Sequence, residues 1–144
     1  MISLREELQF IQDYLEIEKA RFGERLQIEE AVDVENAVIP CFTLQPLIEN
    51  AIKHGAAPKI GRTTIRIAVT RVNGHLCIEV RDDGIGMTPD SLKSMLERGY
   101  GLRNLVDRLQ ILYAADFSWH VESEFQSGTR VSLQLPYDGS VERT

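Results

Sequence analysis

Basic residues are scarce in this sequence and are nowhere clustered. Lys and Arg together number 16 against 22 Asp and Glu, so the formal net charge is −6. Proteins bind nucleic-acid phosphates mainly through Lys and Arg, and an acidic chain without a basic cluster argues against that class of partner. We therefore expect no nucleic-acid binding.

Long apolar runs and closely spaced cysteines are also absent. No stretch reaches the roughly 20 apolar residues that a membrane-spanning helix needs, and no signal-peptide pattern stands ahead of the first expected helix. The two cysteines, Cys41 and Cys77, lack a Cys-x-x-Cys spacing. This favours buried, reduced thiols in a cytosolic protein over a disulfide or a metal site.

What remains is the composition of one globular domain. The chain has 144 residues, of which 43% are hydrophobic and 26% are charged. That is enough for a single domain with its own core. We find no internal repeat and no low-complexity segment.

A first amphipathic helix is expected over residues 3–22. Ser3 is a suitable N-cap, and Glu6 stands at the capping-box distance from it. The apolar residues of this segment recur at heptad spacing, at Leu4, Leu8, Ile11, Leu15 and Phe22. Such a seam suits either a helix packed on its own domain or one that continues into an upstream dimerising coil, and the sequence favours neither.

A second helix is expected over residues 43–55, after a short strand over 26–32 and a connection over 35–40. Thr43 is the expected N-cap, and Gly55 is the expected C-terminal stop. The apolar stripe of this helix consists of Leu44, Leu47, Ile48, Ala51 and Ile52.

The neighbouring face of the second helix carries Asn50, Lys53 and His54. Residues three and four apart lie side by side on a helix, so these three side chains share one face. Their amide, ammonium and imidazole groups suit a ligand made of metal and phosphate. An ordinary solvated helix face has the same composition, and this motif alone leaves both interpretations open.

Two alternating strands, over residues 64–72 and 75–80, flank Asn73-Gly74, which is a strong hairpin signal. The second strand runs into Arg81-Asp82-Asp83-Gly84-Ile85-Gly86-Met87. Glycine lets a ligand approach the backbone closely, and the carboxylate of Asp82 is a hydrogen-bond acceptor. The pattern suits a planar ligand with an exocyclic amine, such as adenine, but a simple surface turn has the same composition.

A short helix over residues 88–96, with Thr88 as N-cap and Pro89 at its first position, precedes a second glycine pair, Gly99-Tyr100-Gly101. We expect this pair to form a loop that opens into a helix ending at Tyr113. Such a loop presents backbone N–H groups and the positive end of the helix to phosphate. The apolar stripe of that helix is Leu102, Leu105, Val106, Leu109 and Leu112.

Two further strands are expected to close the fold, over residues 116–122 and 129–135. A turn ending in Gly128-Thr129 connects them, and Pro136 ends the second strand. The polar tail up to Thr144 is expected to be frayed.

These features together resemble a known family. The helix with Asn50, the Asp82-x-Gly84-x-Gly86 turn, the Gly99-x-Gly101 segment and the Gly128-Thr129 turn are similar to the ATP-binding domain of DNA gyrase, heat-shock chaperones, mismatch-repair ATPases and sensor histidine kinases. Three stretches resemble the LytS-type sensor histidine kinases in particular: YLEIEKARF at 14–22, LQPLIENAIKHG at 44–55, and GYGLRN at 99–104 with Arg108-Leu109 after it.

The resemblance covers nearly the whole chain and implies a fold. It implies an α/β (α+β) two-layer sandwich, the Bergerat ATP-binding fold, in which helices cover one face of a mixed, mostly antiparallel sheet. ATP would lie between the helices and a lid formed by residues 87–98.

The resemblance also assigns roles in the ATP site. Asn50 would coordinate Mg²⁺, Lys53 would lie near the phosphates, and His54 would lie beside them in a less definite role. Asp82 would bind the adenine amine, with support from Thr129. Gly84 and Gly86 would let the base lie against the loop. The other expected ATP-binding residues are Met87, Gly99, Tyr100, Gly101 and Leu102, of which the two glycines would present amides to the phosphates.

Two departures from related proteins narrow the expected chemistry. Gyrase-like ATPases place a water-activating glutamate one helical turn before the magnesium asparagine, where this chain has Pro46. That argues against efficient hydrolysis and for transfer to a protein acceptor. His54, His75 and His120 do not fit the phosphoacceptor histidine that such kinases carry on an upstream helix, so no catalytic residue is certain within this chain.

We therefore expect the ATP-binding catalytic domain of a two-component sensor histidine kinase. Residues 1–22 would link to an upstream dimerisation and phosphoacceptor region, 23–137 would bind Mg·ATP, and 138–144 would be a polar tail. The γ-phosphoryl would pass to a histidine outside this chain and then to a response regulator.

The full-length kinase would be a homodimer, and this chain would be the cytoplasmic part of a membrane-bound bacterial sensor. The alternatives are a serine kinase of the anti-sigma type and a nucleotide-sensing module without phosphotransfer.

Overall fold

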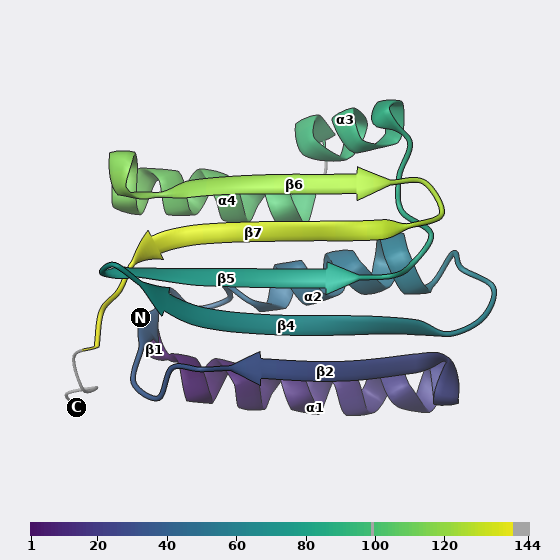
Figure 1. Cartoon of the computed structure of the whole chain (residues 1–144), viewed down its shortest axis with the longest axis horizontal. Helices are drawn as coiled ribbons and strands as arrows, with labels where there is room; N and C mark the ends of the chain where they lie inside the picture. The colour runs from purple at the N-terminus through teal and green to yellow at the C-terminus, as the bar shows by residue number, and fades with distance from the viewer. Residues whose placement is uncertain (99, 140–144) are drawn as a thin grey trace.

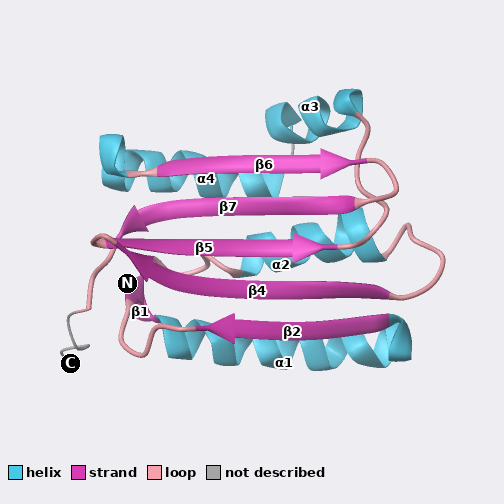
Figure 2. Ribbon diagram, in the orientation of Figure 1, coloured by secondary structure: helices cyan, strands magenta, loops and turns pink. Residues whose placement is uncertain are grey.

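A five-stranded sheet with helices over one face forms the body of the protein (Figure 1, Figure 2). The structure is a computed structural model that describes residues 1–98 and 100–139. The strand order is β2-β4-β5-β7-β6. The β2–β4 pair is parallel and the other three pairs are antiparallel. The expected two-layer sandwich with a mixed, mostly antiparallel sheet is confirmed.

The strands lie close to the ranges expected from the sequence. They are β2 (Leu26–Val32), β4 (Thr63–Val72), β5 (His75–Asp82), β6 (Ser118–Glu124) and β7 (Gly128–Pro136). The expected hairpin between β4 and β5 is confirmed: Asn73 and Gly74 have φ values of 51° and 80°, as a two-residue turn between twisted strands requires.

A second, two-stranded sheet pairs β1 (Ile2–Ser3) with β3 (Val38–Ile39). The strand β3 lies in the segment 35–40 that was expected to be a plain connection. Its pairing depends on residues more than 30 positions away, so local sequence does not reveal it.

The helices are α1 (Leu4–Phe22), α2 (Gln45–Ala51), α3 (Pro89–Arg98) and α4 (Tyr100–Tyr113), with short turns η1 (Gly23–Arg25), η2 (Ile52–Ala56) and η3 (Ala114–Asp116). Three of them, α1, α2 and α4, lie behind the sheet, and α3 lies beyond its β6 edge (Figure 1). None of the helices in the described part of the chain is long and apolar enough to cross a membrane.

One hydrophobic core fills the space between the sheet and the helices. The inward-facing residues of the central strands are fully buried, among them Ile65, Ile67, Val69, Leu76, Ile78, Val131 and Leu133. They share this core with Leu4, Ile11 and Leu15 of α1. The first helix therefore packs on its own domain, as one of the two interpretations of its heptad seam required.

Two expectations for the second helix are wrong. Thr43 does not cap it: its hydroxyl donates to the carbonyl oxygen of Pro40 at 2.6 Å, and the helix N-cap is Leu44. Gly55 does not stop it, because the chain continues through η2 as a π-helical turn up to Ala56.

Three smaller corrections concern exposure and the second glycine pair. Leu112 is 53% exposed rather than part of the apolar stripe of α4. Cys41 and Cys77 are free thiols, but they are half-buried rather than buried. Gly101 lies inside the first turn of α4 rather than in a loop, and Gly99 falls outside the described residues.

Residues 137 and 138, near the end of the described chain, are held to the fold by backbone hydrogen bonds. The Tyr137 backbone N–H donates to Gly74 at 2.9 Å, and Val38 donates to the carbonyl of Asp138 at 2.8 Å. The expectation of a frayed tail concerns mainly residues 140–144, which lie outside the described residues.

Candidate functional site

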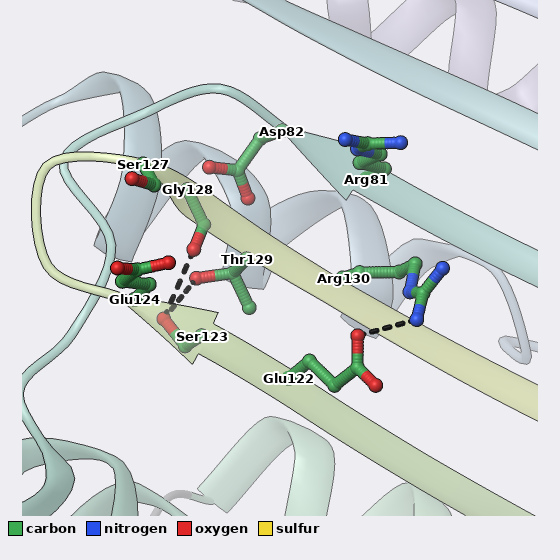
Figure 3. A pocket seen from close by; sticks show the side chains of 9 residues that line it. All are labelled: Arg81, Asp82, Glu122, Ser123, Glu124, Ser127, Gly128, Thr129 and Arg130. Carbon is green, nitrogen blue, oxygen red and sulfur yellow. Dashed lines mark hydrogen bonds and ion pairs between the residues drawn. The ribbon is translucent and has the colours of Figure 1, made fainter.

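Three polar side chains lie side by side on the helix-covered face, where β5 and β6 end and β7 begins. Asp82 pairs in register with Thr129, and Thr129 pairs with Ser123. The same row continues across the sheet through Ile65 and Ile28. We call these five residues the inner row. Its three polar members border one cavity of about 330 Å³ at the β6–β7 turn (Figure 3).

The carboxylate of Asp82 is held under close constraint. The side chain is 4% exposed, and its Oδ1 accepts a hydrogen bond from the Gly84 backbone N–H at 2.9 Å. Burial raises the pKa of Asp82 to about 6, and the charge of Asp83 adds to the rise. Hydrogen bonds from the backbone N–H groups of Gly84 and Thr129, and the charge of Lys59, oppose it. The site thus holds an acceptor that is costly to bury, which is typical of functional positions.

Glycines around Asp82 are required by close backbone approach. A Cβ on Gly84 would lie 2.4 Å from the Cα of Gly55, and a Cβ on Gly55 would lie 2.4 Å from Asp82 Oδ1. A Cβ on Gly86, which has φ +69°, would lie 1.9 Å from the carbonyl oxygen of Glu124. The turn after β5 therefore fits between η2 and the β6–β7 hairpin only because Gly84 and Gly86 carry no side chains.

Backbone hydrogen bonds fix the same turn at several points. Ile85 donates from its N–H to Gly55 at 3.1 Å and accepts from the N–H of Gln126 at 2.5 Å. The N–H of Met87 donates to Ser123 Oγ at 2.9 Å. Beyond Met87 the chain enters α3, which Thr88 caps as expected by accepting from the N–H of Ser91 at 3.2 Å.

Asn50, Lys53 and His54 project from α2 and η2 into two adjoining cavities on the helix side. The smaller cavity, about 150 Å³, is also bordered by Gly101 and Leu102 of α4. The larger one, about 530 Å³, is lined by Lys53 and His54, by the β5–α3 turn and by α3, with residues Ile85, Gly86, Met87, Thr88, Ser91, Ser94, Met95 and Arg98. Burial and the charge of Lys53 lower the pKa of His54.

The start of α2 is held from two other helices. The buried carboxylate of Glu7 on α1 accepts from the backbone N–H groups of Thr43, Leu44 and Gln45. Burial raises the pKa of Glu7, and these hydrogen bonds oppose the rise. From α4, the guanidinium of Arg108 donates to the carbonyls of the preceding residues 41 and 42. The helix that carries Asn50 is thereby tied to α1 and α4.

The structure divides the expected site residues into two groups. Asp82 and Thr129 meet at the end of the sheet, while Asn50, Lys53, His54, Gly86, Met87, Gly101 and Leu102 line the helix-side cavities. Gly84 lies between the groups, packed on Gly55. Gly99 is outside the described residues, and the side chain of Tyr100 is likewise not described.

Several residues that shape the site were missed by the sequence analysis. Ser123, Glu7 and Arg108 act through partners between 5 and 67 positions away, and Gly55 was interpreted as a helix stop. The neighbouring acid of the motif, Asp83, supports the fold by accepting the N–H of Thr64 at 2.7 Å. Glu7 lies outside the heptad positions of the first helix, so nothing in the sequence indicated that its carboxylate is buried and needs a partner.

The donor set around Asn50 fits a magnesium ion that is held largely by a nucleotide. In the described part of the chain no group of three His, Cys, Asp or Glu residues could hold a metal by itself. Mg²⁺ keeps several waters and is commonly bound by one or two protein oxygens plus substrate phosphates. A single amide oxygen beside the Lys53 ammonium matches that pattern.

Comparison with known proteins agrees with the geometry. A family model described as "Histidine kinase-, DNA gyrase B-, and HSP90-like ATPase" matches residues 40–139, and one described as "Histidine kinase" matches residues 1–26. The sensor histidine kinase YesM of Bacillus subtilis is 35% identical over 138 residues, and BtsS of Escherichia coli is 37% identical over 139. The sensor protein LytS of Bacillus subtilis is 34% identical over 146 residues. Each match covers 94% of this chain.

The chain spans about a quarter of the length of these relatives, 24% of YesM and BtsS and 25% of LytS. Solved structures share the fold at low identity. The mycobacterial sensor histidine kinase MprB has a TM-score of 0.70 at 17% identity, over 96% of this chain and 97% of that one. The histidine kinase domain from Erythrobacter litoralis EL346 has a TM-score of 0.65 at 20% identity, over 82% of this chain and 55% of that one. This chain therefore belongs to the family of histidine kinase-, DNA gyrase B- and HSP90-like ATPases.

Proposed function

We propose that this chain is the ATP-binding catalytic domain of a two-component sensor histidine kinase. One observation carries the proposal: a buried carboxylate, that of Asp82, lies in register with Thr129 at the end of the sheet, beside a turn in which Gly84 and Gly86 have no room for side chains. Two oxygen acceptors next to bare backbone suit the exocyclic amine of adenine. The base would therefore bind at Asp82, with Gly84 and Gly86 allowing it to lie against the chain.

The phosphates would extend toward the helix-side cavities. Lys53 would neutralise phosphate charge, Asn50 would supply an oxygen to Mg²⁺, and the first turn of α4 would offer backbone N–H groups near Gly101. In the described residues Lys53 forms no ion pair that would compete with a phosphate. Bound magnesium would neutralise the developing charge on the transferred group. The protein would mainly position the nucleotide, as phosphoryl transfer requires.

Transfer, rather than hydrolysis, is the reaction we propose. Pro46 stands one helical turn before Asn50, where it offers no base to activate water, and it borders the same cavity. The acceptor would be a histidine on a helix upstream of α1, separated from α1 by the strand β1 and the Ser3 cap, and the phosphoryl group would pass on to a response regulator. The relatives named sensor histidine kinases support this assignment. Homodimerisation and a cytoplasmic position below a membrane-bound sensor complete the proposal.

The proposal is tested with radiolabelled Mg·ATP and the full-length protein, followed by the chemical stability of the phosphate. We expect acid-labile, base-stable label on a histidine upstream of this chain, and loss of the label in Asn50→Ala. Acid-stable phosphoserine would point instead to an anti-sigma-type serine kinase. Nucleotide binding without any transfer would point to a nucleotide-sensing module, and either result would overturn the proposal.

A further inference from the structure

The hydroxyl of Ser123 lies at the centre of the polar end of the inner row. Its Oγ is 2.9 Å from the backbone N of Met87. It is also 3.2 Å from the carbonyl oxygen of Gly128 and 2.7 Å from Thr129 Oγ1 (Figure 3). These three contacts come from the base of the lid, from the β6–β7 turn and from the adenine-side threonine. One half-buried hydroxyl thus joins three parts of the candidate site.

The chemistry of these groups fixes the direction of each hydrogen bond. Met87 N–H can only donate and the Gly128 carbonyl can only accept, while a serine hydroxyl has one hydrogen to give. All three bonds form together only when Ser123 donates to Gly128 and accepts from both Met87 and Thr129. In that arrangement the hydroxyl hydrogen of Thr129 points at Ser123, so the Thr129 oxygen can only accept a hydrogen bond from a ligand.

We propose that Ser123 is a specificity-determining residue of the nucleotide site, because it holds the Thr129 hydroxyl as an acceptor beside the carboxylate of Asp82. The amino group at position 6 of adenine has two hydrogens and satisfies both acceptors. Hypoxanthine carries a carbonyl oxygen at that position, so the Thr129 oxygen faces another acceptor. This inference rests on the proposed function and identifies the residue that makes the site select adenine over hypoxanthine.

The removal of Ser123's hydroxyl frees Thr129 to rotate and to donate its hydrogen. Ser123→Ala therefore weakens the binding of ADP more than the binding of inosine diphosphate. The ratio of the two affinities should fall by about tenfold, which is the effect of one hydrogen bond. In a Thr129→Val background the same change in Ser123 has no further effect on the preference, because the hydroxyl it orients is gone.

The experiment is isothermal titration of the chain with ADP and with inosine diphosphate, which differ at position 6 and in the proton on N1. Ser118→Ala is the matched control, a serine on the exposed face of the same strand, and should keep the wild-type preference. Ser123→Thr keeps a hydroxyl and should also keep it. If circular dichroism shows that Ser123→Ala is unfolded, the nearly isosteric Ser123→Cys, a poor donor, takes its place.

The outcomes separate this inference from the proposed function. If the wild-type chain binds neither nucleotide, the proposed function and the inference both fail. If it binds ADP but Ser123→Ala weakens both nucleotides equally, Ser123 only supports the fold and the inference alone is wrong. Equal wild-type affinity for the two nucleotides also overturns it alone. A narrowed preference that vanishes in the Thr129→Val background supports it.

Discussion

Two adjacent rows of the same sheet have opposite characters. The inner row faces the helices, and its polar groups Asp82, Thr129 and Ser123 bond to one another or to nearby backbone. One residue away along each strand lies a row on the open face, which we call the outer row: Glu29, Arg66, Arg81, Arg130 and Glu122. Both rows lie on the same strands in the same register, and they differ only in the face of the sheet on which their side chains lie.

The outer row places three arginines directly opposite one another on neighbouring strands. Arg130 forms an ion pair with Glu122, whereas Arg66 and Arg81 form none within the described residues. Like charges opposite each other weaken strand pairing, but exposure to water and salt keeps the cost small. The comparison teaches that burial determines how much an unpaired polar group costs in stability. A buried polar group needs a hydrogen-bond partner, whereas an exposed charge is tolerated without one.

The largest effect on stability and binding is expected from a side chain at Gly84, where the turn after Asp82 packs tightly on Gly55. Gly84→Ala places a methyl group 2.4 Å from Gly55, so η2 and the β5–α3 turn must separate. We expect a loss of about 3 kcal/mol in the free energy of unfolding and no measurable ADP binding.

Gly101→Ala is the control for this substitution, since its methyl group meets nothing within 4 Å. In a helix it should leave stability unchanged or raise it by about 0.5–1 kcal/mol. Denaturant unfolding measures both variants. Wild-type stability in Gly84→Ala would show that the glycine contact is not tight.

The second test removes the charge of the inner row. Asp82→Asn replaces one acceptor oxygen by a donor, which should weaken ADP binding by about 100-fold, the loss of a charge-assisted hydrogen bond. Arg66→Gln neutralises a charge of the outer row and should leave affinity unchanged. Calorimetric titration decides between them. Retained binding in Asp82→Asn would remove Asp82 from the adenine site.

The third test uses pH, because the inner row should titrate near neutrality. The pKa of Asp82 is raised to about 6 from an ordinary value of 3.8. Ionisation is therefore harder in the folded state, and the free energy of unfolding should fall as pH rises from about 4 to about 6, then level off. A shift of two pKa units corresponds to about 3 kcal/mol.

Subtraction of the Asp82→Asn curve from the wild-type curve cancels contributions from other groups such as Glu7. ADP affinity should show the opposite trend and decline below about pH 6, where the carboxylate becomes protonated. His54 borders the phosphate side, so the titration is repeated in His54→Asn. A flat difference curve between pH 4 and 7 would mean that the carboxylate is not constrained as described.

Much of the fold could be predicted from local patterns. Alternating polarity marked the strands over 64–72 and 75–80, which are β4 and β5, and Asn73-Gly74 marked the hairpin between them, because strand facing and positive φ are properties of nearby residues. The sheet β1–β3, the π-helical turn η2 and the cap of α2 by Glu7 depend on distant partners. Local sequence carries no trace of such contacts.

The candidate site shows the same division. Asp82 and Thr129 were singled out from motifs, and the structure places them in register, although their roles in ATP binding stay predictions. Ser123 has no motif of its own, and only the β6–β7 register brings it to Thr129. Resemblance could supply single residues of the site, but not the hydrogen-bond network that joins them.

The smallest expected effect belongs to the outer row. Arg81→Glu would set an acid between Arg66 and Arg130, so two repulsive cross-strand neighbours would become two attractive ones. We expect the free energy of unfolding to rise by about 0.5–1 kcal/mol at low salt. The gain should disappear near 1 M salt, where the Debye length is about 3 Å. Urea unfolding at both salt concentrations measures the difference, with Arg81→Gln separating lost repulsion from gained attraction. An increase in the free energy of unfolding that persists at high salt would have to come from packing. Side chains of the outer row would then depend on close packing, as we propose only for the inner row.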